Sequence, residues 1–194
     1  LQEVLASAAQ HIGQQISYTK LSSNFTGPTN KKAFDLLTTS KVLHKIPSVS
    51  PLAMPLSGNV LSKRFKAVFL DIGLLTAMRG VDAEYTGDYH GVFKGSVAEQ
   101  FVGQELIAAH NGEVYYWIRE ARSSQSEVDY LIAREDDIKP IEVKSGASGR
   151  LRSLHQVLKE YPSLKRGYVL SEQTYAELPE QQVVYMPIYY AGYL

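Results

Sequence analysis

Two stretches of alternating polar and apolar residues constrain the fold of this chain more than any other feature of its sequence. They cover residues 128–133 and 138–144, and a polar loop of four residues, 134–137, separates them. Alternation with a period of two is typical of β-strands with one buried face, and a short polar loop between two such strands indicates a hairpin. A hairpin around this loop pairs residues whose numbers sum to 271. This register decides which side chains share a face.

The register brings charged side chains together on one face of the predicted hairpin. Asp129 lies opposite Glu142, and Glu127 lies opposite Lys144. Opposed residues on one face have Cβ atoms about 4.5–5.5 Å apart, and like charges there destabilise the sheet. The alternate positions, which we expect to form the core face, are Val128, Tyr130, Ile141 and Val143. Two opposed carboxylates on the polar face indicate a binding site for a cation.

The residue types on this face are typical of a divalent metal site. Mg²⁺ is commonly held by one or two carboxylates together with water and a substrate phosphate. We therefore expect Mg²⁺ or Mn²⁺ at Asp129 and Glu142. Lys144 lies two residues beyond Glu142 on the same face, where it is placed to orient an attacking water or to stabilise developing negative charge.

Other acidic residues in this part of the chain allow more than one interpretation. Glu99 is a candidate third carboxylate, but Ser96 and Glu99 also match a helix capping box. Glu127 and Lys144 also match an ordinary cross-strand salt bridge, which contributes up to about 1 kcal/mol. Glu105 falls within the apolar arc of its predicted helix, where a carboxylate needs a partner. We keep Glu105 and Glu127 as reserve site residues.

The composition is that of a globular protein stabilised by an apolar core. Of 194 residues, 44% are hydrophobic and 21% are charged, which excludes disorder, and the length allows one large domain or two small ones. The chain has no cysteine, so disulfides and thiolate zinc sites are excluded. No apolar run approaches the roughly 20 residues of a membrane helix, and no signal-like leader opens the sequence. We expect a cytoplasmic protein with no membrane partner.

The first part of the chain has the pattern of a small winged-helix domain. Its predicted elements are three helices, two strands and a closing helix, over residues 1–13, 18–24, from 29, 42–46, 65–70 and 71–78. A polar, turn-rich stretch follows, so we place this domain at residues 1–80. Because residues 1–13 already read as the middle of an amphipathic helix, we expect the chain to be a fragment of a longer protein.

Basic charge gathers in this first part. Residues 1–66 hold 8 Lys/Arg against 2 Asp/Glu, a net +6, whereas residues 67–90 and 91–194 each carry −3. Lys31 and Lys32 stand in the first turn of the third predicted helix, where the helix dipole disfavours cations. They are candidates for DNA contact, because the N-terminal end of a recognition helix meets the groove. The alternative is a pair of exposed lysines at a small cost in stability.

The second part, residues 91–194, has the pattern of a mixed α/β domain. Its predicted order is a helix, three strands, a helix and a strand, over residues 96–110, 114–118, 128–133, 138–144, 153–161 and 167–170. The phosphate-binding loop of NTPases, the dinucleotide-binding glycine motif and the serine-hydrolase elbow are missing from the sequence. The five histidines are scattered, with no pair at metal-binding spacing.

The charged residues and their order resemble the PD-(D/E)XK nuclease superfamily. In that superfamily a helix, a hairpin and an E-x-K strand carry the site, and Glu99, Asp129 and Glu142-Val-Lys144 follow in that order. Residues 94–106 are also similar to the first helix of archaeal Holliday junction resolvases. The resemblance implies an α/β fold with a restriction-endonuclease-like mixed sheet flanked by helices, preceded by a small winged-helix domain.

A further resemblance covers nearly the whole chain. Its segments include Phe69-Leu-Asp-Ile-Gly-Leu-Leu75, Tyr115-Tyr-Trp117, Glu127-Val-Asp-Tyr130, Pro140-Ile-Glu-Val-Lys-Ser-Gly146 and Met186-Pro-Ile-Tyr-Tyr190. Together they are similar to the domain of unknown function (4143) that follows the ATPase module in many prokaryotic AAA+-like ATP-binding proteins. This resemblance implies that an ATPase module precedes Leu1 in the full protein.

The resemblance also implies roles for individual residues. The implied metal ligands are the side chains of Glu99, Asp129 and Glu142 and the carbonyl of Val143. Lys144 is the implied catalytic lysine. Val128 stands where the second motif of the superfamily usually has a proline.

Two functions from different classes follow from these observations. The leading hypothesis is a DNA endonuclease dependent on Mg²⁺ or Mn²⁺, and Arg150 and Arg152 offer such an enzyme a basic approach to DNA. The alternative is a non-catalytic DNA- or protein-binding module that targets an ATPase, with the basic first part making the contact. The sequence also leaves a homo-oligomer open.

Overall fold

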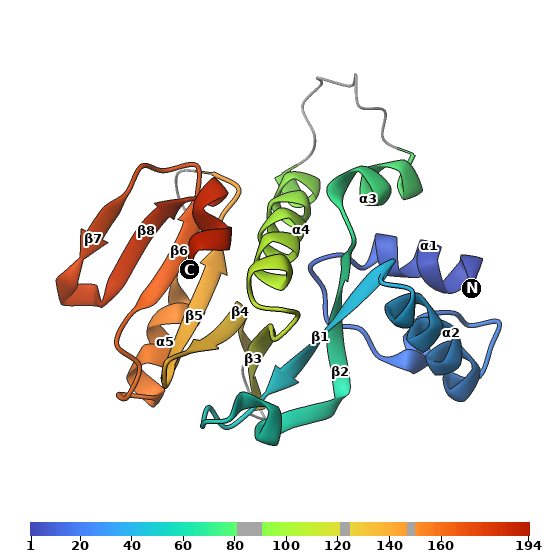
Figure 1. The fold of residues 1–194 in the computed structure, drawn as a ribbon, viewed down its shortest axis with the longest axis horizontal. Coiled ribbons are helices and arrows are strands. Elements are labelled where there is room, and N and C mark those ends of the chain that lie inside the picture. The colour runs from blue at the N-terminus through green and yellow to red at the C-terminus, as the bar shows by residue number, and fades with distance from the viewer. Residues whose placement is uncertain (81–90, 121–124, 147–149) are drawn as a thin grey trace.

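An eight-stranded sheet runs through the described residues of the computed structural model, which are 1–80, 91–120, 125–146 and 150–194 (Figure 1). Its strands lie in the order β2-β1-β3-β4-β5-β6-β8-β7, with both parallel and antiparallel neighbours. Their bounds are β1 Leu43–Val49, β2 Val60–Phe69, β3 Tyr115–Glu120, β4 Gln125–Arg134, β5 Asp137–Val143, β6 Gly167–Ser171, β7 Ala176–Leu178 and β8 Val183–Pro187. The predicted mixed sheet flanked by helices is confirmed.

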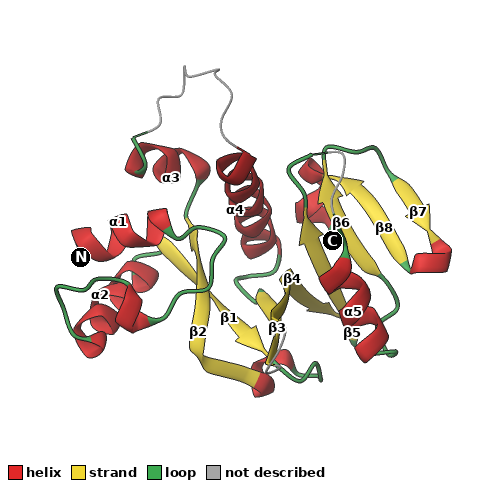
Figure 2. Ribbon diagram, turned by 180° about the vertical axis from the view of Figure 1, so that it is seen from behind, coloured by secondary structure: helices red, strands yellow, loops and turns green. Residues whose placement is uncertain are grey.

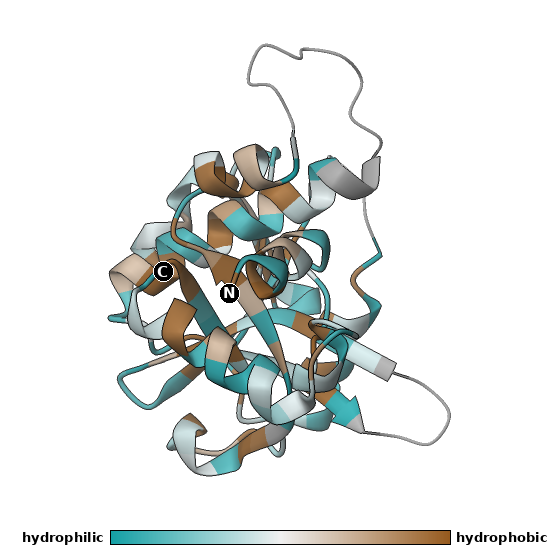
Figure 3. Ribbon diagram, turned by 90° about the vertical axis from the view of Figure 1, so that its right-hand side faces the viewer, coloured by the Kyte–Doolittle hydropathy of each residue, from teal (hydrophilic) through white to brown (hydrophobic). Residues whose placement is uncertain are grey.

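Helices pack against both faces of this sheet and around one end of it (Figure 2). The α-helices are α1 Gln2–Gln10, α2 Gly27–Thr39, α3 Ile72–Met78, α4 Gly91–Ala109 and α5 Arg152–Glu160. Single turns of 3₁₀-helix are η1 Tyr18–Lys20, η2 Leu56–Asn59 and η3 Pro179–Gln181, and a longer one, η4 Ile188–Tyr193, closes the chain. Three apolar clusters result: α4 and η4 on one face, α5 on the other, and α1, α2 and α3 against β1 and β2. Figure 3 shows helices that carry both hydrophobic and hydrophilic positions, as amphipathic helices do.

The prediction of an α-helix over residues 18–24 is wrong. Residues 18–24 contain only the 3₁₀ turn η1, and the following residues are turns. The side-chain amide of Asn30, which is buried, donates to the backbone carbonyls of Tyr18 and Ser22. This side chain therefore satisfies carbonyls that a longer helix would have used itself.

The two strands of the first part pair with each other as predicted, but they also belong to the main sheet. β1 pairs antiparallel with β2 on one side and parallel with β3 on the other. β2 is the edge strand, and the buried side chain of Gln100 on α4 bonds both the N–H and the carbonyl of Phe69 at 2.9 Å each. The first part is thus joined to the rest through backbone and side-chain hydrogen bonds.

The predicted hairpin is confirmed in register. β4 and β5 pair antiparallel from Tyr130↔Ile141 to Arg134↔Asp137, and every pair sums to 271. Glu135 and Asp136 form the two-residue turn with φ values of 50° and 61°, which is the pattern of a type I′ turn. The four residues expected on one core face are all buried, but they do not share a face. Tyr130, Ile141 and Val143 pack on the side of α4, whereas Val128 packs on the side of α5.

Among the residues that the structure describes, no helix combines the length and the apolar character needed to cross a membrane.

Candidate functional site

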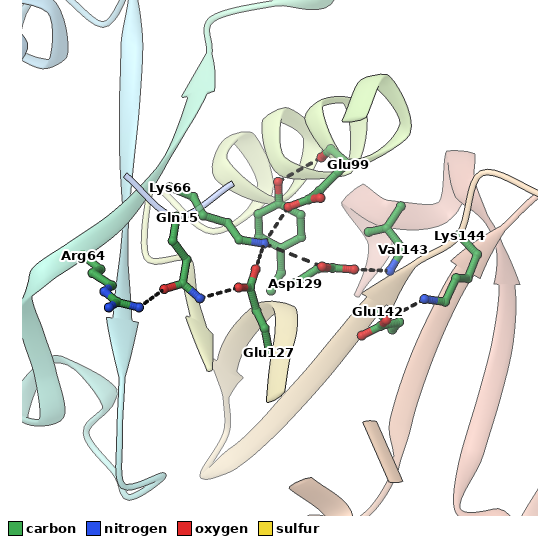
Figure 4. Close-up of polar contacts among 10 residues, drawn as sticks. Gln15, Arg64, Lys66, Glu99, Glu127, Asp129, Glu142, Val143 and Lys144 are labelled. Carbon is green, nitrogen blue, oxygen red and sulfur yellow. Dashed lines mark hydrogen bonds and ion pairs between the residues drawn. The ribbon is translucent and has the colours of Figure 1, made fainter. Parts of the chain in front are cut away.

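Lys66 on β2 lies at the centre of a cluster of carboxylates (Figure 4). Its side chain is 1% exposed, and its Nζ lies 2.7 Å from Glu99 Oε1 on α4. The same ammonium pairs with Glu127 and lies 3.6 Å from Asp129 Oδ1, both on β4. The rings of Tyr116 and Tyr130 also face Nζ, with centroids 5.3 and 5.9 Å away. One buried cation is therefore surrounded by three acidic side chains and two aromatic rings.

The alternation of β2 directs Lys66 into this cluster. Phe65, Ala67 and Phe69 pack with the helices α1 to α3, whereas Val68 packs with α4 on the opposite face. Side chains two apart in a strand share a face, so Lys66 lies on the same face as Val68. A lysine inside an apolar run is thereby placed against α4 instead of solvent.

A bulge in β4 lets two acidic residues of that strand reach the same ammonium. Val128 pairs with Trp117, but Leu131 pairs with Tyr115, so β4 uses one more residue than β3 over this stretch. A bulge disturbs the alternation and redirects side chains, and bulges are common beside functional sites. Glu127 and Asp129 both face Lys66 in consequence.

Further contacts hold the carboxylates of the cluster in place. The hydroxyl of Tyr130 donates to the backbone carbonyl of Glu99 at 2.9 Å. Gln15 Nε2 donates to Glu127 Oε2 at 2.6 Å, and Gln15 Oε1 accepts from Arg64 Nη1 at 3.2 Å. Gly13 has a positive φ of 73°, and a Cβ there would lie 2.9 Å from Glu99 Oε2. The loop after α1 thus closes over the cluster.

The cluster shifts the pKa values of its members. Burial alone would lower the pKa of Lys66, but the charges of Glu99, Glu127 and Asp129 raise it well above its ordinary value. Burial raises the pKa of Glu99 to about 8, against the opposing effect of Lys66. The cluster therefore keeps its ammonium charged, and burial makes the Glu99 carboxyl harder to ionise than a free one.

Glu142 and Lys144 form a second group beside this cluster. Lys144 Nζ donates to Glu142 Oε1 at 2.6 Å. Asp129 stands between the two groups, because its Oδ2 accepts from the backbone N–H of Val143 at 2.8 Å while its Oδ1 faces Lys66. Burial and then the charge of Asp129 raise the pKa of Glu142 to about 7. Its Oε2 is buried without a hydrogen-bond partner among the described residues.

The predicted site residues divide into those that come together and those that do not. Glu99, Asp129, Glu142 and Lys144 gather on α4, β4 and the end of β5. The predicted pair of Glu127 with Lys144 is wrong: β5 ends at Val143, Lys144 pairs with Glu142, and Glu127 pairs with Lys66 and Gln15 instead.

Glu105 lies outside this arrangement. Its carboxylate accepts a long hydrogen bond of 3.4 Å from Gln104, and it faces Gly192 of η4. The α4 helix turns it away from Lys66, six residues after Glu99.

The basic candidates lie in two separate places. Lys31 and Lys32 are exposed on α2, and Lys31 forms an ion pair with Asp35 at 2.5 Å. Arg150 and Arg152 are exposed at the start of α5. Figures 1 and 2 show α2 and α5 toward opposite ends of the molecule, so these four residues do not form one continuous surface.

The carboxylates in their present arrangement do not fit a divalent ion. Across residues 1–80, 91–120, 125–146 and 150–194, no group of three or more histidine, cysteine or acidic side chains is placed to hold a metal. The physical reason lies in the cluster: the ammonium of Lys66 takes the position that a cation bound by Glu99, Glu127 and Asp129 would need.

The sequence predictions missed Lys66, Gln15 and Gly13. The available signal for Lys66 was a charged residue inside the apolar run of 65–70, which a half-exposed strand does not explain. Gln15 and Gly13 carry no local signal, since they act on residues more than 80 positions away.

Comparisons with known protein families match two separate segments of the chain, and the residues of the cluster come from both. A family model described as Domain of unknown function (DUF4143) matches residues 94–190, which is half of the chain, and another, Domain of unknown function (DUF8612), matches residues 1–85. No curated protein and no solved structure matches the chain. Lys66 falls in the second match and its carboxylate partners fall in the first.

Proposed function

The chain belongs to the family defined by the domain of unknown function DUF4143, and from the geometry of its site we propose that it is a DNA-binding module in which the nuclease-like half serves as a scaffold. One observation carries the non-catalytic part of this proposal. The acidic cluster already contains a cation, because Lys66 is buried among Glu99, Glu127 and Asp129. A site in that state has no room for the ion that phosphodiester hydrolysis would use.

The charge distribution of the first 66 residues supports the binding part. Two of the eight basic residues form ion pairs, Lys66 in the cluster and Lys31 with Asp35. The other six are exposed: Lys20, Lys32, Lys41, Lys45, Lys63 and Arg64. Basic side chains on a surface bind the phosphate backbone through release of its counterions.

An aromatic ring lies among these basic residues. Tyr18 in η1 has Lys31 and Lys45 at 5.7 and 5.4 Å from its ring centroid, and Lys45 Nζ donates to its hydroxyl at 3.0 Å. The buried side of α2, through Phe34, packs against the same ring. The exposed side of α2 carries Lys32, so this helix is the element that we expect to meet a DNA groove, as in winged-helix proteins.

The sequence of this chain resembles a domain that follows an ATPase module in many AAA+-like ATP-binding proteins. This resemblance is the basis for a proposal about what the DNA contact serves. We propose that the DNA contact of this chain targets an ATPase that belongs to the same protein.

Fluorescence anisotropy with a labelled DNA duplex between 50 and 200 mM salt tests the proposal. We expect Lys20→Ala/Lys32→Ala to weaken binding and to reduce the slope of log K against log salt by about 2, since each phosphate contact contributes about 0.9. The matched control is Arg150→Ala/Arg152→Ala, which removes the same charge from the other end of the molecule. Equal slopes in wild type and in both variants would contradict the proposal.

A second candidate function is phosphodiester hydrolysis, and one observation favours it. Asp129, Glu142 and Lys144 lie together, and the buried Oε2 of Glu142 has no hydrogen-bond partner among the described residues. Plasmid nicking in the presence of Mn²⁺ tests this candidate, with Glu142→Gln and Lys144→Ala beside the wild type. Nicking by the wild type that both variants lose would establish it, and nicking that persists in both variants would contradict it.

A further inference from the structure

The carboxylate cluster holds more negative charge than one lysine requires. Three carboxylates contact Lys66, and they come from two elements, α4 and β4. The attraction within a buried ion pair offsets the loss of hydration only when the geometry is good and the remaining lone pairs have hydrogen-bond partners. A single carboxylate would neutralise the ammonium, so the other two are not explained by the stability of an ion pair.

The chemistry of the donor set is that of a cation site. Glu99, Glu127 and Asp129 supply hard oxygen donors, which are the ligands of Mg²⁺, Ca²⁺ and Mn²⁺. Their convergence on one point is shown by the single nitrogen atom that contacts all three. The ligand of this cluster in the present structure is therefore an ammonium ion supplied by the chain itself.

A second observation favours more positive charge beside the cluster than Lys66 alone supplies. Glu142 is 8% exposed, and its Oε2 is buried without a hydrogen-bond partner among the described residues. It stands beside Asp129, on the side away from Lys66 (Figure 4). A buried carboxylate oxygen without a partner is costly, and a larger charge at the centre of the cluster would compensate for it.

We propose that Lys66 is a built-in substitute for a divalent cation: its ammonium occupies the position of the ion, excludes it, and fixes the segment of residues 1–80 onto α4 and β4. Removal of this one side chain turns the cluster into a divalent-cation site.

Isothermal titration calorimetry tests the proposal, with Mn²⁺ titrated into the wild type, Lys66→Ala and Lys63→Ala. Lys63 is an exposed residue of the same strand, so Lys63→Ala controls for the loss of one positive charge near the site. We expect Lys66→Ala to bind Mn²⁺ at least 10-fold more tightly than the wild type, and Lys63→Ala to behave as the wild type. Equal binding by all three proteins, or binding by none, would overturn the proposal.

A further variant tests whether the ion binds at the carboxylates of the cluster. Lys66→Ala/Glu127→Gln lacks one of the three carboxylates, and we expect it to lose most of the Mn²⁺ affinity gained by Lys66→Ala. Unchanged affinity in the double variant would show that the ion binds elsewhere and would overturn the assignment.

Refolding keeps the test decisive if Lys66→Ala does not fold in the absence of an ion. The titration is then replaced by a refolding experiment. The protein is diluted from urea into buffer with 5 mM Ca²⁺ or with EDTA, and circular dichroism measures its folding. Folding of Lys66→Ala in Ca²⁺ but not in EDTA supports the proposal. Failure in both buffers, while Lys66→Met/Glu99→Gln/Glu127→Gln folds in both, would show that Lys66 is only a structural partner of the carboxylates.

Discussion

At the scale of single residues, the loss of Lys66 leaves three carboxylates without the cation that they share. Removing one partner of a buried ion pair typically costs about 3–5 kcal/mol, because the remaining charge stays buried. We expect Lys66→Ala to lower the free energy of unfolding by that amount in metal-free buffer, as measured by urea denaturation. Lys63→Ala, a change at an exposed position of β2, should alter it by less than about 0.5 kcal/mol. Similar losses in the two variants would contradict the burial of Lys66 in the acidic cluster.

The raised pKa of Glu99 has a consequence for stability as a function of pH. Its pKa is about 8 in the folded chain against an ordinary value of 4.5, so the folded state holds the proton more tightly. The stabilisation from this proton is fully present below pH 4.5 and is lost as the pH rises to about 8. One proton corresponds to a slope of about 1.4 kcal/mol per pH unit.

We therefore expect the wild type to lose stability relative to Glu99→Gln between pH 5 and 8, as measured by urea denaturation at each pH. Lys66 stays charged throughout this window in both states, since its pKa is raised above its ordinary 10.5. Glu113→Gln, a change at an exposed carboxyl, is the control. A constant difference between wild type and Glu99→Gln across this range would contradict the raised pKa.

Gly13 allows a separate test of how closely the loop after α1 approaches Glu99. Alanine at residue 13 meets both a positive φ of 73° and Glu99 Oε2 at 2.9 Å, whereas alanine at Gly112 meets a positive φ of 84° and no described atom within 4 Å. We expect Gly112→Ala to cost about 1 kcal/mol of unfolding free energy, and Gly13→Ala to cost more. Equal losses for the two variants would show that the loop does not press on Glu99.

The sequence predicted the acidic residues of the site better than it predicted their partners. Asp129 and Glu142 come close because alternation and loop length determine a hairpin register. Lys66 was missed because its partners lie 33 to 63 positions away in the sequence, and periodicity describes only neighbours. The predicted pairing of Glu127 with Lys144 is wrong for the same reason, since a distant lysine competes for Glu127.

At the scale of elements, the turn between β4 and β5 offers a stabilising change. Glu135 and Asp136 both adopt positive φ values, which Asn and Gly tolerate better in a type I′ turn. We expect Glu135→Asn/Asp136→Gly to raise the free energy of unfolding by about 1 kcal/mol. The control is Glu135→Ala/Asp136→Ala, which removes the same charges but should not stabilise. Stabilisation by both variants would point to charge instead of turn geometry.

The strands of the first part show where prediction from local pattern ends. Their approximate positions and antiparallel pairing follow from alternation and the intervening loop. The parallel pairing of β1 with β3 does not, because it joins residues 48–49 to 116–117 through only two paired positions. Neither β7 nor β8 was predicted as a strand. β7 has only three residues, all of them exposed, which are too few to show alternation.

At the scale of the whole molecule, the two matched segments meet at a buried charged cluster, in addition to the pairing of β1 with β3. Lys66 comes from the segment of residues 1–85, and the carboxylates come from the segment of residues 94–190. The net charge of zero hides this division, because residues 1–66 carry a net +6 whereas residues 67–90 and 91–194 each carry −3. The same division separates the basic surface of the first segment from the acidic cluster that Lys66 closes.

The most direct test of this account is anomalous diffraction at the manganese edge from crystals of the wild-type chain grown in Mn²⁺. The account predicts no manganese peak among Glu99, Glu127 and Asp129, with Lys66 Nζ in contact with these carboxylates. A manganese ion bound by Glu99 and Asp129, with the Lys66 side chain turned out of the cluster, would contradict it.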